Sequence, residues 1–215
     1  MTLHQFDHDI DPGRTALVLI ECQNEWLAPD GKLQLVIEDR PQFERAAKGA
    51  LTLLQLARDA QMSVAHVGLR FAEGHPEMGA GGFGLRGAIK QFGTFPSASP
   101  ASEFAPGFTP RTGEFVVRGR VGGSAFAGSN LDIWLRNNAI DTVILAGFAL
   151  HVCVESSLRA AHDLGYFSYV AQDATAAFNS AQRKHVLDDV VPHFGKALSN
   201  ANLQSLLSTF QELSA

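Results

Sequence analysis

The chain has 215 residues, of which 46% are hydrophobic and 18% are charged, and its mean hydropathy is close to zero. This composition excludes an intrinsically disordered chain. The longest apolar run, Thr142 to Leu150, has about half of the ~20 residues that a bilayer requires, which excludes a membrane span. With 17 Lys and Arg against 22 Asp and Glu, the chain does not have the basic net charge that is typical of nucleic-acid binders. We expect one domain over residues 1–215 and, since the N-terminus lacks the pattern of a secretion signal, a cytoplasmic location.

The first half of the chain predicts two strands around one long helix. Thr15 to Ile20 is a short apolar run typical of a strand buried on both faces, and Val64 to Leu69 is a second run of this kind. Between them Pro41 opens a helical stretch, in which five small or apolar residues recur at helical spacing and form one face: Ala47, Ala50, Leu51, Leu54 and Ala57.

A long irregular region follows from about Phe71 to Thr112, rich in Gly, Pro, Ser and Phe. Loops of this length are uncommon inside compact domains and are usually functional. We therefore expect the region to supply walls of an active site and contacts between subunits, with one short helix near Leu85 to Gln91.

The second half predicts four further strands and four helices. The strands are expected at Phe115 to Arg118, Thr142 to Ala146, Tyr166 to Ala171 and Lys196 to Leu198. Ser129, with Asp132 three residues on, resembles a capping box that opens the first helix, and Asp173 is expected to cap or turn the chain after its strand. The other helices are expected at His151 to Leu164, Gln182 to Val190 and Asn202 to Leu213.

Alternating apolar strands and amphipathic helices predict an α/β fold. The expected architecture has three layers, α-β-α, around a doubly wound, mostly parallel sheet of about six strands. In such sheets ligands bind beyond the carboxyl ends of the strands. Chemistry is therefore expected just after four residues: Ile20, Leu69, Arg118 and Ala146.

Three strand ends carry reactive side chains. Glu21 ends the first strand, where a carboxyl either caps the next turn or takes part in a reaction, because it is costly to bury unless it is paired or used. Cys153 lies in the first turn of the helix after the fourth strand, where the helix end favours a thiolate. Arg118 and Arg120 share a face of an extended chain, so either could supply a fixed cation or stay solvated.

The chain has two cysteines, Cys22 and Cys153, far apart in the sequence. Without a C-x-x-C motif, thioredoxin-like chemistry and zinc ribbons are excluded. We expect two free thiols, of which Cys153 is the candidate nucleophile.

These features resemble the isochorismatase-like cysteine hydrolase family, which includes nicotinamidases and N-carbamoylsarcosine amidohydrolases. The likeness covers about Thr15 to Leu198. It rests on a strand that ends in an acid followed by Gln-Asn, on a Ser-Ala-Phe preceded by a basic residue, and on the Gly147 to Ser156 segment with Asp173-Ala174-Thr175 downstream.

The resemblance implies a triad of Asp, Lys and Cys. Its cysteine falls on Cys153, its aspartate on Glu21, and its lysine on Arg120, with Arg118 as the alternative because a residue is inserted here. Two positions therefore keep the charge of the family's residue but change its shape. The family's oxyanion hole falls on the amides of Ala149 and Cys153, with the Phe148–Ala149 peptide bond cis.

The resemblance also implies a reaction. We expect a metal-free hydrolase of a small amide, carbamoyl or ureido C–N bond that works through a Cys153 thioester, with Glu21 moving the protons and Arg120 stabilising the charges. The pocket is expected to be lined by Trp26, Phe71, Phe126 and His151, with Arg118 nearby. The alternative is a weak or inactive member that binds a metabolite or a partner protein, in which the Glu21 and Arg120 ion pair closes the site.

No cofactor is expected. The metal motif of nicotinamidases, Asp-x-His after the second strand, is replaced here by the segment from His66 to Arg70. His4, Asp7, His8 and Asp9 lie on a terminal segment and are not expected to ligate a metal. The resemblance further implies a homodimer or homotetramer.

Overall fold

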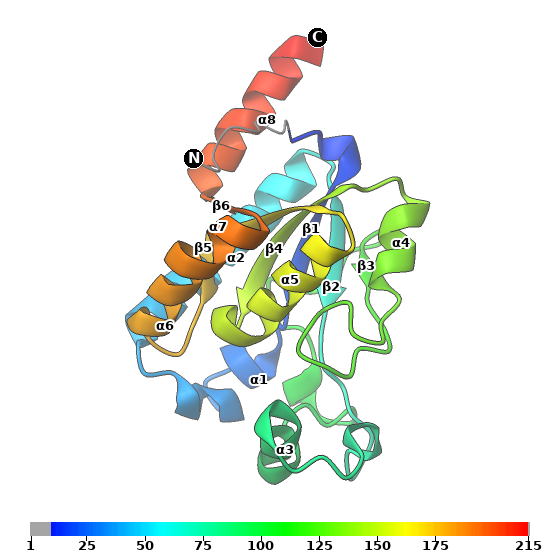
Figure 1. The fold of residues 1–215 in the computed structure, drawn as a ribbon, viewed down its shortest axis with the longest axis vertical. Helices are drawn as coiled ribbons and strands as arrows, with labels where there is room; N and C mark the ends of the chain where they lie inside the picture. The colour runs from blue at the N-terminus through cyan, green and yellow to red at the C-terminus, as the bar shows by residue number, and fades with distance from the viewer. Residues whose placement is uncertain (1–9, 215) are drawn as a thin grey trace.

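The computed structural model describes residues 10–214 and contains a six-stranded sheet at its centre (Figure 1). All strand pairs are parallel, and the strand order is β3-β2-β1-β4-β5-β6. The expected three-layer, doubly wound α/β fold is therefore confirmed. The chain winds outward from β1 in one direction and from β4 in the other, so the order reverses between these two strands, which is where such sheets bind ligands.

The strands lie where the apolar runs predicted them, with changed ends. β2 ends two residues early, at Val67, and β4 continues two residues further, to Phe148. β3 stops two residues early because the Arg118 amide donates to the Asn130 side chain rather than to a neighbouring strand. β5 is longer than expected, so Asp173 lies inside the strand, where its carboxylate accepts the Asn200 amide. The strands are β1 Thr15–Ile20, β2 Ser63–Val67, β3 Phe115–Val116, β4 Thr142–Phe148, β5 Phe167–Ala176 and β6 Lys196–Leu198.

Helices cover both faces of the sheet (Figure 1). The long helix α2 packs on β5, β2 and β4 and also contacts α8, while α5 packs on β4 and β5 and contacts α7. The α-helices are α1 Asn24–Leu27, α2 Arg40–Asp59, α3 Gly84–Phe92, α4 Leu131–Asn137, α5 Glu155–Asp163, α6 Ser180–His185, α7 Val191–Phe194 and α8 Asn200–Ser214. Single turns of 3₁₀-helix lie at Pro12–Arg14, Lys32–Val36, Pro76–Met78 and Pro100–Ser102, and π-helical turns at Leu150–Val154 and Val186–Val190.

Several helix starts differ from the sequence-based expectation, and those of α4 and α6 have a local cause. The Ser129 hydroxyl accepts the Leu131 amide, but α4 begins after Asn130 and the predicted capping box with Asp132 does not form. α6 begins two residues early, because Asn179 and Gln182 form a capping box of their own. Both differences arise because several polar residues compete to satisfy the same free amides.

The central strands hold the apolar core on both faces. Every residue of β1 and β4 is buried. Side chains that alternate along β1 belong to two separate apolar clusters, one under α2 and the other under α4 and α5. This double burial fixes the ends of β1 and β4, and with them the positions of the polar residues that follow.

A buried polar network ties α2 to β2 and β3. Glu114 accepts hydrogen bonds from Arg58, at 2.7 and 3.0 Å, and its carboxylate lies 2.7 Å from Nε2 of the fully buried His66. Burial of Glu114 opposes its charge, but the hydrogen bonds from Arg58, the Arg111 amide and His66 outweigh it and lower the pKa of Glu114 from 4.5 to about 2.

The lowered pKa of Glu114 predicts how the free energy of unfolding depends on pH. As the pH falls from about 4.5 to about 2, the unfolded chain binds the Glu114 proton before the folded chain does, so stability is lost across this window. We expect Glu114 to contribute about 2 kcal/mol of this loss, which urea unfolding at pH 5 and pH 3 would measure. Glu114→Gln should flatten the dependence, and an unchanged slope would contradict the assignment.

The N-terminal residues His4, Asp7, His8 and Asp9 lie outside the described part of the chain. Within residues 10–214 there is no group of three or more His, Cys, Asp or Glu side chains arranged to hold a metal ion. No helix in the same range is long and apolar enough to cross a membrane.

Candidate active site

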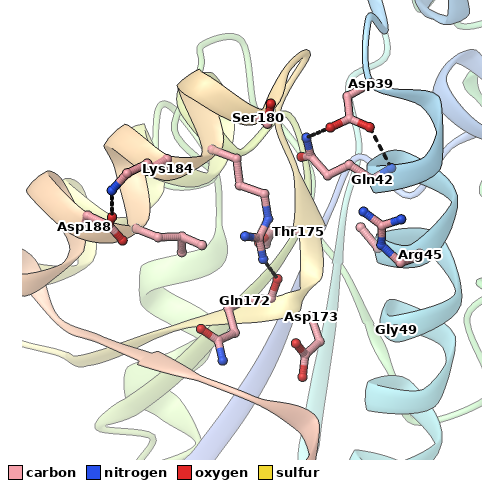
Figure 2. Close-up of a pocket in the computed structure, with 13 residues that line it drawn as sticks. Asp39, Gln42, Arg45, Gly49, Gln172, Asp173, Thr175, Ser180, Lys184 and Asp188 are labelled. Carbon is pink, nitrogen blue, oxygen red and sulfur yellow. Dashed lines mark hydrogen bonds and ion pairs between the residues drawn. The ribbon is translucent and has the colours of Figure 1, made fainter.

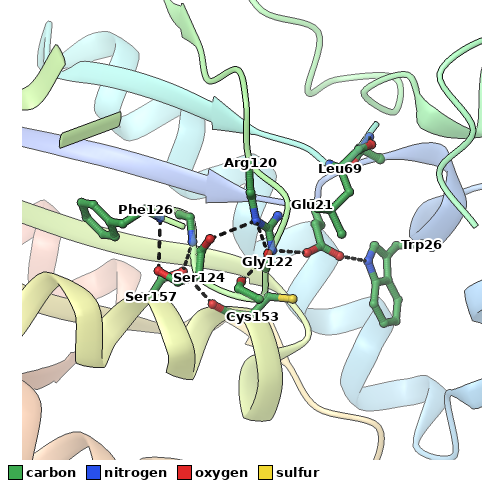
Figure 3. Close-up of polar contacts among 12 residues, drawn as sticks. Glu21, Trp26, Leu69, Arg120, Gly122, Ser124, Phe126, Cys153 and Ser157 are labelled. Atoms are coloured by element: carbon green, nitrogen blue, oxygen red, sulfur yellow. Dashed lines mark hydrogen bonds and ion pairs between the residues drawn. The ribbon is translucent and has the colours of Figure 1, made fainter. Parts of the chain in front are cut away.

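Glu21 lies directly beyond β1, where the chain turns sharply. Its backbone has a φ of 56°, in the left-handed region that residues other than glycine seldom adopt, and its amide donates to the Val67 carbonyl of β2 at 2.7 Å. One carboxylate oxygen accepts the Trp26 indole N–H at 2.8 Å, and the other accepts Nη2 of Arg120 at 2.6 Å (Figure 3). The carboxylate is therefore buried but held at both oxygens.

Arg120 is the basic residue that reaches this carboxylate. It comes from the loop after β3, and its side chain is 1% exposed. Its guanidinium also donates to the carbonyls of Gly122 and Gly123, at 3.0 and 2.7 Å, which fixes the loop around it. Arg118 is exposed, whereas Arg120 is buried and donates to Glu21, so the geometry favours Arg120 of the two predicted arginines.

Cys153 reaches the same place from β4. The Phe148–Ala149 peptide bond is cis, as the family resemblance implied, and a π-helical turn follows it. Gly147 allows this turn to lie close to β1, because a Cβ there would sit 1.9 Å from the Ile20 carbonyl oxygen. The Cys153 thiol lies beside the Glu21–Arg120 pair, and both charges act on its pKa (Figure 3). Three segments that are distant in sequence thus bring a thiol, a carboxylate and a guanidinium together.

The surroundings of Cys153 oppose the thiolate that the helix end by itself would favour. Burial and the neighbouring Glu21 charge raise the pKa of Cys153 well above its usual range, and the opposing effect of Arg120 is smaller. The sequence placed Cys153 correctly in a first helical turn, but it could not show that the sulfur would be buried beside a carboxylate. In this geometry Glu21 is placed to accept the thiol proton when the sulfur reacts.

Of the two predicted oxyanion donors, Ala149 directly precedes the π-helical turn and Cys153 lies within it. Ala149 and Cys153 both line the cavity above the thiol. The Cys153 amide donates to the Ala149 carbonyl at 3.0 Å, so it can serve a second acceptor only by sharing its hydrogen, which is common at helix ends. The oxyanion role of these two amides stays a prediction.

A cavity of about 270 Å³ opens above Cys153 and Glu21. Trp26 lines it, as predicted, but the four other residues assigned to the pocket do not. Phe71 is fully buried and packs near His75, Phe126 stacks on Tyr166, and the ring of His151 contacts Phe178 edge-on. The prediction that Phe71, Phe126, His151 and Arg118 line the pocket is therefore wrong. The walls come instead largely from the Lys32–Val36 turn and α3.

The domain model of one known family matches most of this chain. The isochorismatase domain covers residues 15–202. The chain belongs to the isochorismatase family. Among curated relatives, the ureidoacrylate amidohydrolase RutB of Caulobacter vibrioides is 29% identical over 216 aligned positions, which cover 95% of this chain and 94% of the relative.

Solved structures of other proteins share the fold of this chain. A cysteine hydrolase from Pseudomonas syringae pv. phaseolicola superimposes with a TM-score of 0.81 at 22% identity and covers 94% of this chain and 96% of its own. An N-carbamoylsarcosine amidase from Thermoplasma acidophilum gives a TM-score of 0.68 at 24% identity, covering 87% and 96%. At these identities the structures support the fold, while membership of this hydrolase family rests on the domain match.

Two buried polar residues support the site of this isochorismatase-family chain and were missed from the sequence. The Gln23 side-chain amide donates to the carbonyls of Leu69 and Ser102, and its oxygen accepts the Leu69 amide, with both Leu69 distances at 2.9 Å. These bonds hold the ends of β1 and β2 together. Glu25 is fully buried and accepts the amides of Lys32 and Phe95, both at 3.1 Å. Gln23 belongs to the Gln-Asn pair noted in the sequence, and Gln23 and Glu25 follow Glu21 at alternate positions; these two signals could have drawn attention to them.

Glu25 joins two walls of the cavity, since Lys32 begins the 3₁₀ turn and Phe95 follows α3. In Glu25→Gln one of the two amides would meet an NH₂ group and lose its acceptor. We expect about 2 kcal/mol of destabilisation and a raised KM with a nearly unchanged kcat. Urea unfolding and steady-state kinetics would measure both, and a loss confined to kcat would contradict a role in the walls.

A larger hollow of about 480 Å³ lies away from these residues, between α2, β5 and α6 (Figure 2). Its charged groups are largely engaged with one another or with the backbone. Asp39 caps α2, Arg183 donates to the Gln172 carbonyl at 2.6 Å, and Lys184 pairs with Asp188. We expect the substrate in the cavity of about 270 Å³ above Cys153, because Cys153 and Glu21 line that cavity and do not line the larger hollow.

Proposed function

We propose that this protein is a metal-free cysteine hydrolase that cleaves the C–N bond of a small amide, carbamoyl or ureido substrate through a thioester. The observation that carries the proposal is the contact of the Cys153 thiol with Glu21 and Arg120 at the base of a cavity. The names of two similar proteins, ureidoacrylate amidohydrolase and N-carbamoylsarcosine amidase, favour C–N bonds as the target.

In the first half of the reaction Glu21 accepts the thiol proton while Sγ of Cys153 attacks the substrate carbonyl carbon. The carbonyl oxygen becomes an oxyanion, which the Ala149 and Cys153 amides are placed to stabilise. When the C–N bond breaks, the departing nitrogen takes the proton from Glu21, and ammonia or an amine leaves. The acyl group remains on Sγ as a thioester.

In the second half Glu21 accepts a proton from water, and the oxygen attacks the thioester carbonyl. The C–S bond then breaks, sulfur takes the proton back from Glu21, and the acid is released. Arg120 stays charged throughout, because the Glu21 charge raises the pKa of its guanidinium against the effect of burial. It balances whichever group, carboxylate or thiolate, carries the negative charge.

Ammonia release from a panel of small amides, carbamoyl compounds and ureas tests the proposal. Mass spectrometry of enzyme quenched during turnover should show an acyl group on Cys153, and hydroxylamine should remove it. Turnover with no adduct in rapid quench, together with full activity of a Cys153→Ser variant, would contradict the thioester route.

A catalytically weak member that binds a metabolite or a partner is the second candidate. It is favoured by the buried ion pair of Glu21 with Arg120 and by the raised pKa of the Cys153 thiol, both of which oppose a reactive sulfur. Iodoacetamide separates the two candidates: selective alkylation of Cys153 that accelerates as the pH rises supports the hydrolase, while an inert thiol supports the binding protein. A homodimer or homotetramer in the cytoplasm stays a prediction from the sequence.

A further inference from the structure

The cavity above Cys153 has apolar walls almost throughout. Apart from Glu21, Cys153 and Thr94, every residue that lines it carries an apolar or aromatic side chain. The aromatic residues are Trp26, Phe92, Phe95 and Phe178, and Leu33 and Ile89 are among the aliphatic ones. The single polar atom of the Trp26 side chain donates to Glu21, so the indole presents carbon to a ligand.

No cationic side chain of the described chain lines this cavity. Two cations that are next to lining residues in the sequence are already engaged. Lys32 donates to the carbonyls of Phe92 and Gly93 at the end of α3, and Arg70 pairs with Glu103. Arg120 lies behind Glu21, which neutralises its charge.

An anionic substrate group would therefore lose its water without gaining a partner. Burying an unpaired carboxylate is strongly unfavourable, and the Glu21 charge at the base of the cavity would repel it further. An apolar group, by contrast, would cover carbon atoms that are otherwise exposed, and about 270 Å³ accommodates a single ring or a short branched chain.

We propose that the part of the substrate beyond the scissile bond is uncharged and apolar, so that the enzyme selects hydrophobic primary amides or monosubstituted ureas over acids of the same size. The inference rests on the proposed function for the reaction and on the cavity walls for the choice of substrate. It assigns specificity to the wall residues of α3 and of the Lys32–Val36 turn, among them Ile89, Leu33 and Val36.

Two matched pairs of compounds test this selectivity. 4-Methylpentanamide and succinamate have the same skeleton and differ only in an isopropyl group in place of a carboxylate. The same exchange relates (3-methylbutyl)urea to N-carbamoyl-β-alanine. We expect kcat/KM to be at least about 100-fold higher for the apolar member of whichever pair is hydrolysed.

A wall variant identifies the cause of the preference. Val36→Arg places a cation at the wall and should reduce the preference at least about tenfold, while Val36→Met, which adds length without charge, should keep it. Leu206→Arg on α8, a similarly apolar and partly exposed position outside the cavity, should leave the ratio unchanged. An unchanged ratio in Val36→Arg would overturn the assignment to this wall.

Binding of the four compounds to Cys153→Ala, measured by isothermal titration calorimetry, separates failure of the inference from failure of the proposed function. If the acids are hydrolysed as well as the apolar compounds, the inference fails and the hydrolase remains. If nothing is hydrolysed but the apolar members bind at least about tenfold more tightly, the choice of ligand holds and the hydrolase fails. If the acids bind equally well or better, the inference fails whatever the activity.

Discussion

Cys153→Ala is expected to lower kcat/KM on the best amide substrate by about 10⁴-fold or more, while the protein stays folded. The sulfur is the atom that forms the covalent bond, and neither Glu21 nor Arg120 can replace it as a nucleophile. The structural cost is small, because the thiol faces the cavity and its removal leaves no new enclosed void. Steady-state kinetics and thermal unfolding of the same preparation would measure both effects.

Cys22→Ala provides the matched control. Cys22 is the other free thiol, is fully buried under α2, and has its pKa raised by burial and by Glu21. We expect this variant to lose about 1 kcal/mol of stability but to keep most of its activity. Equal losses in the two cysteine variants would mean that activity depends on packing rather than on the Cys153 sulfur.

The reacting side chains at the strand ends could be predicted from the sequence, but the choice of arginine could not. Glu21 and Cys153 were found because apolar runs mark where β1 and β4 leave the sheet, and strand ends in a parallel sheet meet at one edge. The choice between Arg118 and Arg120 could not be made, because strict alternation ends where β3 does. The structure shows a strand of only two residues, and Gly119, with a φ of 82°, turns the chain between Arg118 and Arg120.

The pocket was less predictable than the reacting groups. Phe126 and His151 are close in sequence to Arg120 and Cys153, which made them natural candidates for its walls. The walls are formed instead by α3 and by residues near Leu33, joined through the buried Glu25. The contact between Glu25 and Phe95, which are 70 residues apart in the sequence, produces no periodic pattern that could predict it. The pKa of Cys153 likewise depends on burial and on contacts with distant residues.

Arg120→Met is expected to destabilise the protein by about 3–5 kcal/mol and to abolish its activity. The side chains of Arg120 and Glu21 are both nearly inaccessible to water, so removing the cation leaves a buried carboxylate without its counter-charge. The guanidinium also holds the loop through the carbonyls of Gly122 and Gly123. Arg120→Lys keeps the charge but not these two contacts and should lie between the wild type and Arg120→Met in stability.

The double variant Glu21→Gln/Arg120→Met separates the structural role of the pair from its chemical role. With both charges gone, the Trp26 indole can still donate to an amide oxygen, and we expect at least half of the lost stability to return. Activity should not return, because glutamine cannot accept the proton of the thiol. Urea unfolding of the four members of the cycle gives the coupling energy. A coupling near zero would show that the two charges, although 2.6 Å apart, do not depend on one another, and the assignment of Arg120 as the partner of Glu21 would fail.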